Sequence, residues 1–417
     1  MCKLKINGNR PLYGEVHVQG SKNAVLPILS ACLLTKSECI IHNCPIISDV
    51  YAALDIIKSL GGRACLIGNT AVVCADIISD GIIEQGLMQK MRSSVMFLGS
   101  ILARNGEAQI CRPGGCRLGE RPIDIHIDSM KKFGASIDES GECIKCKLEC
   151  IKGEKAVLLY PSVGATENIM LMCALSDSVC EIVNPAREPE IKDLQNFLNA
   201  MGADIRGAGS DRIIIRGVKK LNGCEYSVIP DRIAAATYLA AAAICGGEVA
   251  VKKVIPQHIL TIIEVLERTG CKVKCSDESI VISKKRRQHA ISNVKTLPYP
   301  GFPTDIQPIM AAYLSLADGT SVIKETIFDG RFGYVCELKK MAAEIECEEN
   351  SIKINGVSRL RGNNVEAADL RGGAALVVAG LAAEGETTVT GVEYIDRGYE
   401  KIEQTLSLLG ARIKRIY

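Results

Sequence analysis

The chain has 417 residues, more than the roughly 250–300 at which one hydrophobic core usually divides, so its length predicts two domains. Hydrophobic residues make up 47% and charged residues 24%, which is typical of a folded protein and argues against disorder. The 50 basic and 48 acidic residues leave a net charge of +2, and there is no Trp, so no general attraction to nucleic acid or membranes is expected.

Targeting and metal-binding signals are weak throughout the sequence. The N-terminal segment lacks the apolar core of a signal peptide, and no uninterrupted apolar stretch approaches the roughly 18 residues of a membrane-spanning helix, so we expect a cytoplasmic protein. Most of the 19 cysteines lie in apolar runs, where a thiol acts as a small hydrophobic side chain. Cys143 and Cys146 have the separation of a zinc knuckle, but no second pair follows. We therefore predict neither a metal site nor a cofactor.

Two short strands are predicted at the start of the chain, over residues 4–6 and 15–18. One pattern then recurs six times: a small-residue-rich apolar helix, a β-rich stretch, a second amphipathic helix with a stop, and two short strands. Because the N-terminal strand pair precedes the first full repeat, we expect it to complete the sheets of the second domain. The predicted helices include residues 24–34, 234–244 and 373–383 of the first kind and residues 50–60, 191–201 and 399–409 of the second kind.

The stops of the second helices define the period. A glycine at such a stop suits a left-handed C-terminal cap, so the alanine in the fifth unit predicts a less well-formed helix end there. The intervals between the stops are 73, 68, 68, 72 and 68 residues, which indicates βαβαββ-like units. The six stop positions are Gly61, Gly134, Gly202, Gly270, Ala342 and Gly410.

The period also predicts how the units are grouped. It exceeds the roughly 20–50 residues of thin solenoid repeats, so compact α/β domains of a few units are favoured. A division into three plus three gives a first domain over residues 22–229 and a second domain that combines residues 1–21 with 230–417. The chain would then pass between the domains twice, and the cleft between them is the expected site.

Polar residues recur at or just before the first helix in nearly every unit. Helix N-termini carry unpaired N–H groups and the positive end of the helix dipole, so several of them beside Lys and Arg predict an anion-binding surface. Taken one at a time, such residues can equally serve as simple caps. The recurring residues are Lys22, Arg92, Thr166, Arg232, Asp305 and Arg371.

Asp305 follows a rigid segment, since residues 299–303 contain two prolines and a glycine immediately before the helix. Two interpretations of Asp305 remain open. The carboxylate can cap the helix, or it can act as a base if the cleft holds a sugar or an alcohol.

A second candidate lies in the segment 111–122, which has three glycines, two prolines and three arginines and is predicted to be a mobile surface loop. Cys116 lies in this loop, outside any apolar run and among cations. Neighbouring cations favour a thiolate, so Cys116 is either a reactive cysteine or an incidental one in a solvated loop.

Ordered motifs along essentially the whole chain resemble those of the UDP-N-acetylglucosamine enolpyruvyl transferase (UDP-N-acetylglucosamine 1-carboxyvinyltransferase) family. The resemblance implies two inside-out α/β barrel domains, each of three βαβαββ units, in agreement with the repeat count. The motifs are Gly-Ser-Lys-Asn-Ala at 20–24, Pro-Gly-Gly-Cys at 113–116, Arg-Pro-Ile-Asp at 121–124, Ser-Val-Gly-Ala-Thr at 162–166, Ala-Arg-Glu-Pro-Glu-Ile at 186–191, Phe-Pro-Thr-Asp at 302–305, Glu-Thr-Ile-Phe at 325–328 and Asp-Arg-Gly-Tyr-Glu at 396–400.

The reaction implied by this resemblance opens peptidoglycan precursor synthesis. The enolpyruvyl group of phosphoenolpyruvate passes to the 3-hydroxyl of UDP-N-acetylglucosamine, and phosphate is released. The two substrates are thus the expected partners, with no nucleic acid, membrane or obligate protein partner and no cofactor.

The resemblance also implies roles for individual residues. Cys116 is similar to a lid cysteine that supplies a proton, can form a covalent adduct with phosphoenolpyruvate and is the target of fosfomycin, whereas Asp305 resembles the base for the sugar hydroxyl. Lys22, Arg121 and Arg397 resemble the cations that bind phosphoenolpyruvate. Asn23 resembles a residue near both substrates, and Arg371 resembles a phosphate-side cation. The residues that resemble sugar-nucleotide contacts are Arg92, Pro122, Ile123, Asp124, Ile125, Ser162, Val163, Gly164, Thr304, Asp305 and Ile327.

The chain departs from the family pattern at two places. Ala234 stands where the family commonly has Glu, and residues 330–334 read Gly-Arg-Phe-Gly-Tyr where it commonly has Asn-Arg-Phe-Met-His. Two alternatives therefore stay open: a transferase like 5-enolpyruvylshikimate-3-phosphate synthase, and a non-catalytic paralogue that binds the sugar nucleotide. The Pro-Gly-Gly-Cys segment and residues 162–164 favour a nucleotide sugar as acceptor.

Overall fold

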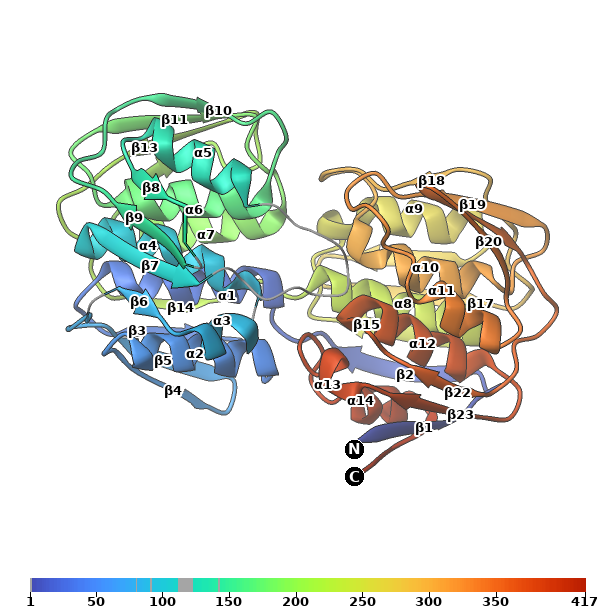
Figure 1. Cartoon of the computed structure of the whole chain (residues 1–417). Helices are drawn as coiled ribbons and strands as arrows, with labels where there is room; N and C mark the ends of the chain where they lie inside the picture. The colour runs from blue at the N-terminus through green and yellow to red at the C-terminus, as the bar shows by residue number, and fades with distance from the viewer. Residues whose placement is uncertain (1, 80, 91, 112–122, 142) are drawn as a thin grey trace. The chain divides into compact units, whose positions relative to one another are not determined.

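The computed structural model describes residues 2–79, 81–90, 92–111, 123–141 and 143–417, and its fold is mixed α/β (Figure 1). The chain divides into two compact units. The terminal unit combines the N-terminal residues up to Gln19 with Pro230–Tyr417 and thus contains both chain ends. The central unit spans the chain from Gly20 to Ile229.

The central unit contains three four-stranded sheets among its described residues. The first sheet has the order β14 (Glu225–Ser227), β3 (Cys39–His42), β5 (Thr70–Cys74) and β4 (Arg63–Ile67). The second has the order β6 (Ile82–Ile83), β7 (Glu107–Cys111), β9 (Cys143–Lys147) and β8 (Ser136–Asp138). The third has the order β10 (Lys155–Val157), β11 (Val179–Val183), β13 (Arg212–Arg216) and β12 (Asp204–Arg206).

The terminal unit also contains three four-stranded sheets. The first has the order β2 (Leu12–His17), β15 (Gly247–Lys252), β17 (Ser279–Lys284) and β16 (Lys272–Ser276). The second has the order β18 (Val294–Lys295), β19 (Thr320–Lys324), β21 (Ser351–Asn355) and β20 (Glu344–Glu348). The third has the order β22 (Asn364–Glu366), β23 (Glu386–Thr390), β1 (Lys3–Asn7) and β24 (Arg412–Ile416).

All six sheets share one pairing pattern, in which the first two strands are parallel and the remaining neighbours are antiparallel. An apolar helix precedes the second strand of each sheet, and in four of the six sheets this helix forms the crossover that a parallel pair needs. These helices are α1 (Lys22–Ala31), α4 (Phe97–Asn105) and α6 (Val163–Ala174) in the central unit and α8 (Arg232–Cys245), α10 (Gln307–Leu314) and α12 (Leu370–Ala382) in the terminal unit.

A second set of helices leads from the second strand of each sheet to its antiparallel strands. It comprises α2 (Ser48–Ser59), α5 (Asp124–Lys132), α7 (Pro189–Ala200), α9 (Leu260–Arg268), α11 (Val335–Lys340) and the pair α13 (Val392–Ile395) and α14 (Ile402–Leu408). Short helical segments complete the described structure: α3 (Gln85–Lys90), η1 (Cys32–Leu34), η2 (Arg92–Met96), η3 (Pro256–Ile259) and η4 (Thr304–Ile306).

The two N-terminal strands lie in sheets of the terminal unit. β1 pairs with both β23 and β24, and β2 runs parallel to β15. The prediction that the N-terminal strand pair completes these sheets is therefore confirmed, although β2 begins three residues earlier than expected. The start and the end of the chain are tied together in one sheet.

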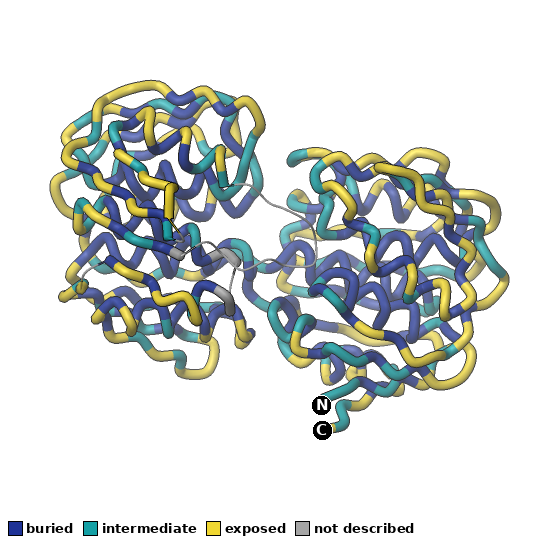
Figure 2. Tube along the Cα trace, viewed as in Figure 1, coloured by how far each residue is buried: buried dark blue, intermediate teal, exposed yellow. Residues whose placement is uncertain are grey.

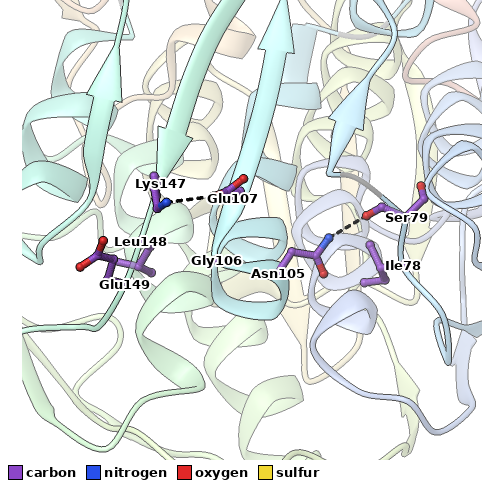
Figure 3. A pocket seen from close by; sticks show the side chains of 8 residues that line it. All are labelled: Ile78, Ser79, Asn105, Gly106, Glu107, Lys147, Leu148 and Glu149. Atoms are coloured by element: carbon purple, nitrogen blue, oxygen red, sulfur yellow. Dashed lines mark hydrogen bonds and ion pairs between the residues drawn. The ribbon is translucent and has the colours of Figure 1, made fainter.

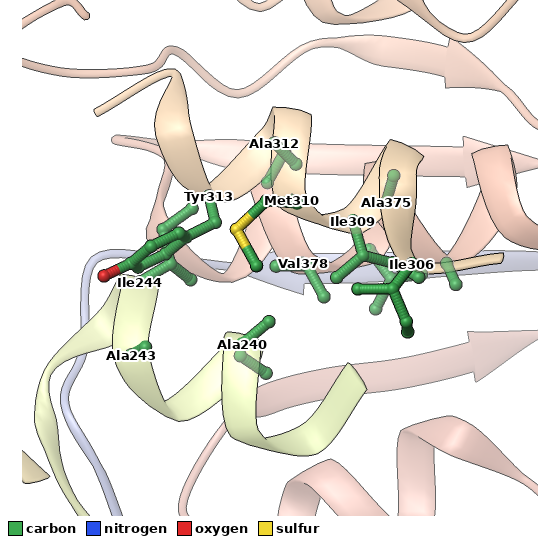
Figure 4. Packing of buried hydrophobic residues seen from close by; sticks show 14 of the residues in the cluster. Ala240, Ala243, Ile244, Ile306, Ile309, Met310, Ala312, Tyr313, Ala375 and Val378 are labelled. Atoms are coloured by element: carbon green, nitrogen blue, oxygen red, sulfur yellow. The ribbon is translucent and has the colours of Figure 1, made fainter. Parts of the chain in front are cut away.

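The apolar helices form the interior of each unit, as the buried traces in Figure 2 show. In the terminal unit α8, α10 and α12 pack against one another, with Ala240, Ile309 and Val378 among the side chains at their contact (Figure 4). A helix that is apolar on all faces is stable only when it is surrounded by protein, and small side chains allow helices to approach closely. This explains why the sequence of these helices is rich in alanine and glycine.

The end of α11 differs from the prediction of a less well-formed helix end at Ala342. Ala342 takes the left-handed conformation, with φ 67°, at the place where the other units have glycine. The cap hydrogen bonds are intact, since Ala342 N donates to Lys339 O at 3.0 Å and Ala343 N donates to Leu338 O at 3.1 Å. The helix end is therefore well formed, and the alanine bears a conformational cost of about 1–2 kcal/mol instead.

We predict that Ala342→Gly raises the free energy of unfolding of the terminal unit by about 0.5–1 kcal/mol, because glycine adopts this conformation without steric cost. Chemical denaturation of the full chain measures the change. The matched substitution is Gly410→Ala, at a position with φ 91° and no atom within 4 Å of an added Cβ, which should destabilise by about 1 kcal/mol. Destabilisation by Ala342→Gly would contradict this interpretation.

Candidate active site

Three helical segments of the terminal unit begin with an aspartate, but the three carboxylates have different partners. Asp231 Oδ1 accepts hydrogen bonds from the N–H groups of residues 233 and 234 at 2.8 and 2.9 Å, and Asp369 Oδ1 accepts from those of residues 371 and 372 at 2.9 Å. Both are caps of their helices, α8 and α12. Asp305 instead lies within η4, and neither Pro303 nor Ile306, the N-cap residues of η4 and α10, forms a side-chain cap hydrogen bond.

The Asp305 carboxylate lies between two guanidinium groups. Oδ1 accepts from Arg331 Nη2 at 2.9 Å, and Oδ2 accepts from Arg371 Nε at 3.1 Å and Nη2 at 2.9 Å. The Asp305 side chain is 25% exposed, whereas the two arginine side chains are each 4% exposed. A partly accessible carboxylate is thus held by two buried cations, which favour its ionised form. We call Asp305, Arg331 and Arg371 the carboxylate clamp.

Arg371 is held in turn by residues from other elements. Burial by itself would lower the pKa of Arg371, but Asp305, Tyr399 and Asp231 together outweigh burial and the pKa is raised. Arg371 Nη1 donates to the Tyr399 hydroxyl at 3.3 Å, and that hydroxyl is 2.8 Å from Thr237 Oγ1 of α8. Burial raises the pKa of Tyr399, so its hydroxyl stays neutral. Arg371 therefore remains a fixed cation.

In the central unit, Lys22 is the first residue of α1 and is buried. Its Nζ lies 2.9 Å from Oδ2 of the buried Asp49, the second residue of α2. Ser21 caps the helix by accepting a hydrogen bond from Ala24 N at 3.4 Å, and Asn23 is half-buried beside it. A lysine at the start of a helix adds its positive charge to that of the helix N-terminus, a combination typical of anion-binding sites.

Two segments predicted to bind the sugar nucleotide are adjacent in the central unit. Ser162 caps α6, since its Oγ accepts from Ala165 N at 3.3 Å. Gly164 packs directly on His126 of α5, so that an added Cβ would lie 2.6 Å from the His126 Cε1. His126 Nδ1 is also 2.9 Å from Asn168 Nδ2 of α6. These contacts place the start of α6 against the first turn of α5, which begins at Asp124.

The remaining predicted residues have varied positions. Thr304, the first residue of η4, is in contact with the clamp through Arg331 Nη1 at 2.8 Å, and half-buried Ile327 lies in the turn that leads to Arg331. Arg397 is half-buried between α13 and α14, two residues before Tyr399. Val163, Ile123 and Ile125 are half-buried and Asp124 is exposed. Cys116, Arg121 and Pro122 lie outside the described residues, as does the side chain of Arg92.

Three residues near Asp305 were not predicted from the sequence. Arg331 bonds Asp305 itself, Glu325 bonds Thr304, and Tyr399 bonds Arg371. All three lie in segments that the analysis quoted, but no role was predicted for them. The only signal was their position in motifs, because their contacts with residues 304–305 and 371 join parts of the chain that are 21 to 28 residues apart. Such long-range contacts leave no local pattern.

The two departures from the family pattern do not disturb the clamp. Ala234 is buried in the first turn of α8, where its N–H is bonded to Asp231. Tyr334 is buried before α11, its hydroxyl accepts a hydrogen bond from Gln307 Nε2 at 2.8 Å, and burial raises its pKa. Neither side chain bonds Asp305, whose two arginine partners are intact.

Two hollows accompany these features. A cavity of about 110 Å³ lies at the start of α12, beside the family departure at residues 330–334. It is lined by Gly333, Tyr334, Glu337, Glu366, Ala368, Asp369, Gly372 and Leu376. A larger groove of about 600 Å³ on the central unit is lined by Ile78, Ser79, Asn105, Gly106, Glu107, Lys147, Leu148 and Glu149 (Figure 3). None of the predicted site residues lines this groove, which is therefore separate from the candidate site.

Within the described part of the chain, no three His, Cys, Asp or Glu side chains gather in a way that could hold a metal ion. No helix formed by these residues is long and apolar enough to cross a membrane.

Comparison with known proteins identifies the family. A family model described as EPSP synthase (3-phosphoshikimate 1-carboxyvinyltransferase) matches residues 6–406. UDP-N-acetylglucosamine 1-carboxyvinyltransferase 2 of Caldanaerobacter subterraneus subsp. tengcongensis is 50% identical, with 100% of both chains covered. The chain belongs to the UDP-N-acetylglucosamine 1-carboxyvinyltransferase family. UDP-N-acetylglucosamine 1-carboxyvinyltransferase 1 of Symbiobacterium thermophilum, another member, is 47% identical over 99% of this chain and 94% of its own.

The fold of this 1-carboxyvinyltransferase family member is similar to that of solved enolpyruvyl transferases. The crystal structure of the enolpyruvyl transferase NikO from Streptomyces tendae matches with a TM-score of 0.89 at 22% identity, covering 99% of this chain and 98% of the other. At this level of identity the match establishes the fold alone.

We predict a pH dependence that arises from His126. Burial lowers its pKa from 6.5 to about 4, so between these values the unfolded chain binds a proton that the folded chain does not. The free energy of unfolding must therefore decrease as the pH falls through this range. His126→Gln removes the titrating group and should weaken this decrease, as measured by denaturation at pH 7, 5.5 and 4. The exposed His17→Gln is the control, and equal acid dependence in His126→Gln and wild type would contradict the prediction.

Proposed function

We infer that the chain transfers the enolpyruvyl group of phosphoenolpyruvate to the 3-hydroxyl of UDP-N-acetylglucosamine with release of phosphate, the first committed step of peptidoglycan precursor synthesis. Its relatives of 43–50% identity over the whole chain carry the corresponding enzyme name. The observation within the structure that supports this function best is the carboxylate clamp, which holds an accessible carboxylate ionised and beside cations.

We propose that the fold consists of two inside-out α/β barrels, each of three βαβαββ units, with domains over residues 22–229 and over 1–21 with 230–417. The pairing pattern shared by all six sheets supports this proposal. Lys22, Arg121 and Arg397 are proposed to bind phosphoenolpyruvate. Residues 123–125 and 162–164, which are adjacent in the structure, are proposed to contact the sugar nucleotide together with Arg92 and Pro122.

The chemistry needs a proton donor and a proton acceptor at different places. Cys116 is proposed to protonate C3 of phosphoenolpyruvate, which makes C2 electrophilic. Asp305 accepts the proton of the sugar 3-hydroxyl as its oxygen forms a bond to C2. The tetrahedral adduct then loses phosphate from C2 and a proton from C3, which restores the vinyl group. Arg371 and the other cations stabilise the negative charge of the phosphate and carboxylate groups throughout.

Asp305 is well placed for such a role because the buried Arg331 and Arg371 hold its two oxygens, while part of its side chain stays exposed. A base must be ionised before it can accept a proton, and the two guanidinium groups keep it so. Thr304 precedes it on the same rigid segment, which is consistent with a common contact to the acceptor sugar.

Phosphate release with different acceptors tests this function. We expect release that depends on UDP-N-acetylglucosamine and is not supported by shikimate 3-phosphate, the acceptor of the alternative transferase. Cys116→Ala and Asp305→Ala should each reduce the rate about 10²- to 10⁴-fold, as expected for loss of a general acid or base. Asp55→Ala, which removes an exposed carboxylate of α2, is the control and should retain the rate.

Three outcomes would contradict the proposal. Release with shikimate 3-phosphate alone would favour the alternative transferase. Binding of UDP-N-acetylglucosamine without any phosphate release would favour a non-catalytic paralogue. Full activity in Asp305→Ala would remove the proposed base.

A further inference from the structure

Glu325 is a buried carboxylate directly after β19, outside the residues to which a role in the reaction has been given so far. It is 1% exposed, and both of its oxygens have hydrogen-bond donors. A buried charge is costly unless it is fully satisfied, so its presence one residue beyond a strand end requires an explanation.

One oxygen of Glu325 organises the local backbone. Oε1 accepts from Thr296 Oγ1 at 2.7 Å and from the N–H groups of Ile327 and Phe328 at 2.8 and 3.3 Å. Thr296 Oγ1 in turn accepts from Thr326 N at 2.8 Å. These bonds fix the start of the turn that runs from β19 to residue 331, and thus the path of the chain toward the clamp.

The other oxygen reaches the clamp through a hydroxyl group. Thr304 Oγ1 donates to Glu325 Oε2 at 2.8 Å and accepts from Arg331 Nη1 at 2.8 Å. A carboxylate only accepts hydrogen bonds, so the single hydroxyl proton of Thr304 must point to Glu325, and a lone pair of the same oxygen then faces Arg331. Glu325 therefore sets the direction in which Thr304 accepts.

The planar guanidinium group transmits this orientation. When Nη1 of Arg331 is fixed on Thr304, the position of Nη2 is fixed as well, and Nη2 is the atom that donates to Asp305 Oδ1 at 2.9 Å. The result is a hydrogen-bonded row in which the neutral Thr304 hydroxyl joins the Glu325 carboxylate to the charged groups of the clamp, Arg331, Asp305 and Arg371.

We propose that Glu325 is a positioning residue for the reaction: it orients Thr304 and Arg331 so that the Asp305 carboxylate faces the acceptor hydroxyl. The role rests on the proposed function, in which Asp305 accepts the hydroxyl proton. Glu325 itself touches no substrate in this account. It acts by holding the base in one geometry, which matters because a small displacement of a reacting group lowers the rate strongly.

Glu325→Gln provides the sharpest test, since it keeps the size of the side chain but replaces one acceptor oxygen with an N–H donor. If the amide nitrogen faces Thr304, the hydroxyl proton turns away and the Arg331 contact is misdirected. We expect kcat for phosphate release to fall about 10- to 100-fold, while KM for UDP-N-acetylglucosamine changes less than about threefold, because the proposed sugar-nucleotide contacts other than Thr304 are untouched.

Glu403→Gln is the matched control. Glu403 is also a buried carboxylate of the terminal unit, and it accepts from Arg415 at 3.0 Å away from the clamp. Its substitution should leave kcat within about twofold of wild type, although it disturbs a comparable charged network.

A double-mutant cycle separates positioning from general stabilisation. In an Asp305→Asn background, Glu325→Gln should have no further effect on kcat, because the group that it positions is already lost. If Glu325→Gln does not fold, Glu325→Asp, which keeps the charge but is too short to span both sides, replaces it in the same cycle.

The measurements distinguish failure of the positioning role of Glu325 from failure of the proposed function. An active wild type with unchanged kcat in Glu325→Gln, or an equal loss in the Asp305→Asn background, would overturn the positioning role alone. Absence of acceptor-dependent phosphate release in the wild type would overturn the proposed function and this role together.

Discussion

The structure of the candidate site depends on one interaction, the attraction between the Asp305 carboxylate and two buried guanidinium groups. Arg331 and Arg371 each need an anion, since a buried cation without one is strongly destabilising. Asp305 supplies it for both, and in return it is kept ionised and oriented while part of it stays accessible. The same contact thereby neutralises two buried cations and favours the ionised carboxylate that a base needs.

The fold makes this contact possible by bringing together distant parts of the chain. Asp305 comes from the segment before α10, Arg371 from the first turn of α12, and the hydroxyl pair of Thr237 and Tyr399 from α8 and the loop before α14. The three apolar helices pack closely along small side chains, and this packing fixes the positions of their N-terminal residues. The N-terminal strand β1 lies between β23 and β24 and so joins them in the sheet to which the strand after α12 belongs. The clamp is a property of the assembled unit rather than of any one motif.

The sequence was informative wherever the structure repeats itself. The alternation of helices and strands and the glycine stops followed from local periodicity, whereas the placement of the N-terminal strands followed from their position before the first predicted repeat. The described elements agree with these predictions. Ala342 shows where such reasoning fails: tertiary packing imposes the left-handed turn even without glycine. Arg331 and Glu325 were not predicted, because their contacts with residues 304–305 span α10 and β19 and depend on side-chain geometry. The Asp305 oxygens point to two guanidinium groups, and this arrangement also depends on tertiary contacts that no local pattern shows.

The charge state of Asp305 is the central claim, and difference infrared spectroscopy measures it directly. Spectra of the full chain are recorded at neutral pH for wild type and for Asp305→Asn, without substrates, and subtracted. The account predicts that the difference contains the bands of an ionised carboxylate hydrogen-bonded to guanidinium groups. A protonated carboxylic acid band assigned to Asp305 would contradict it, because a group that already carries the proton cannot accept one from the acceptor hydroxyl.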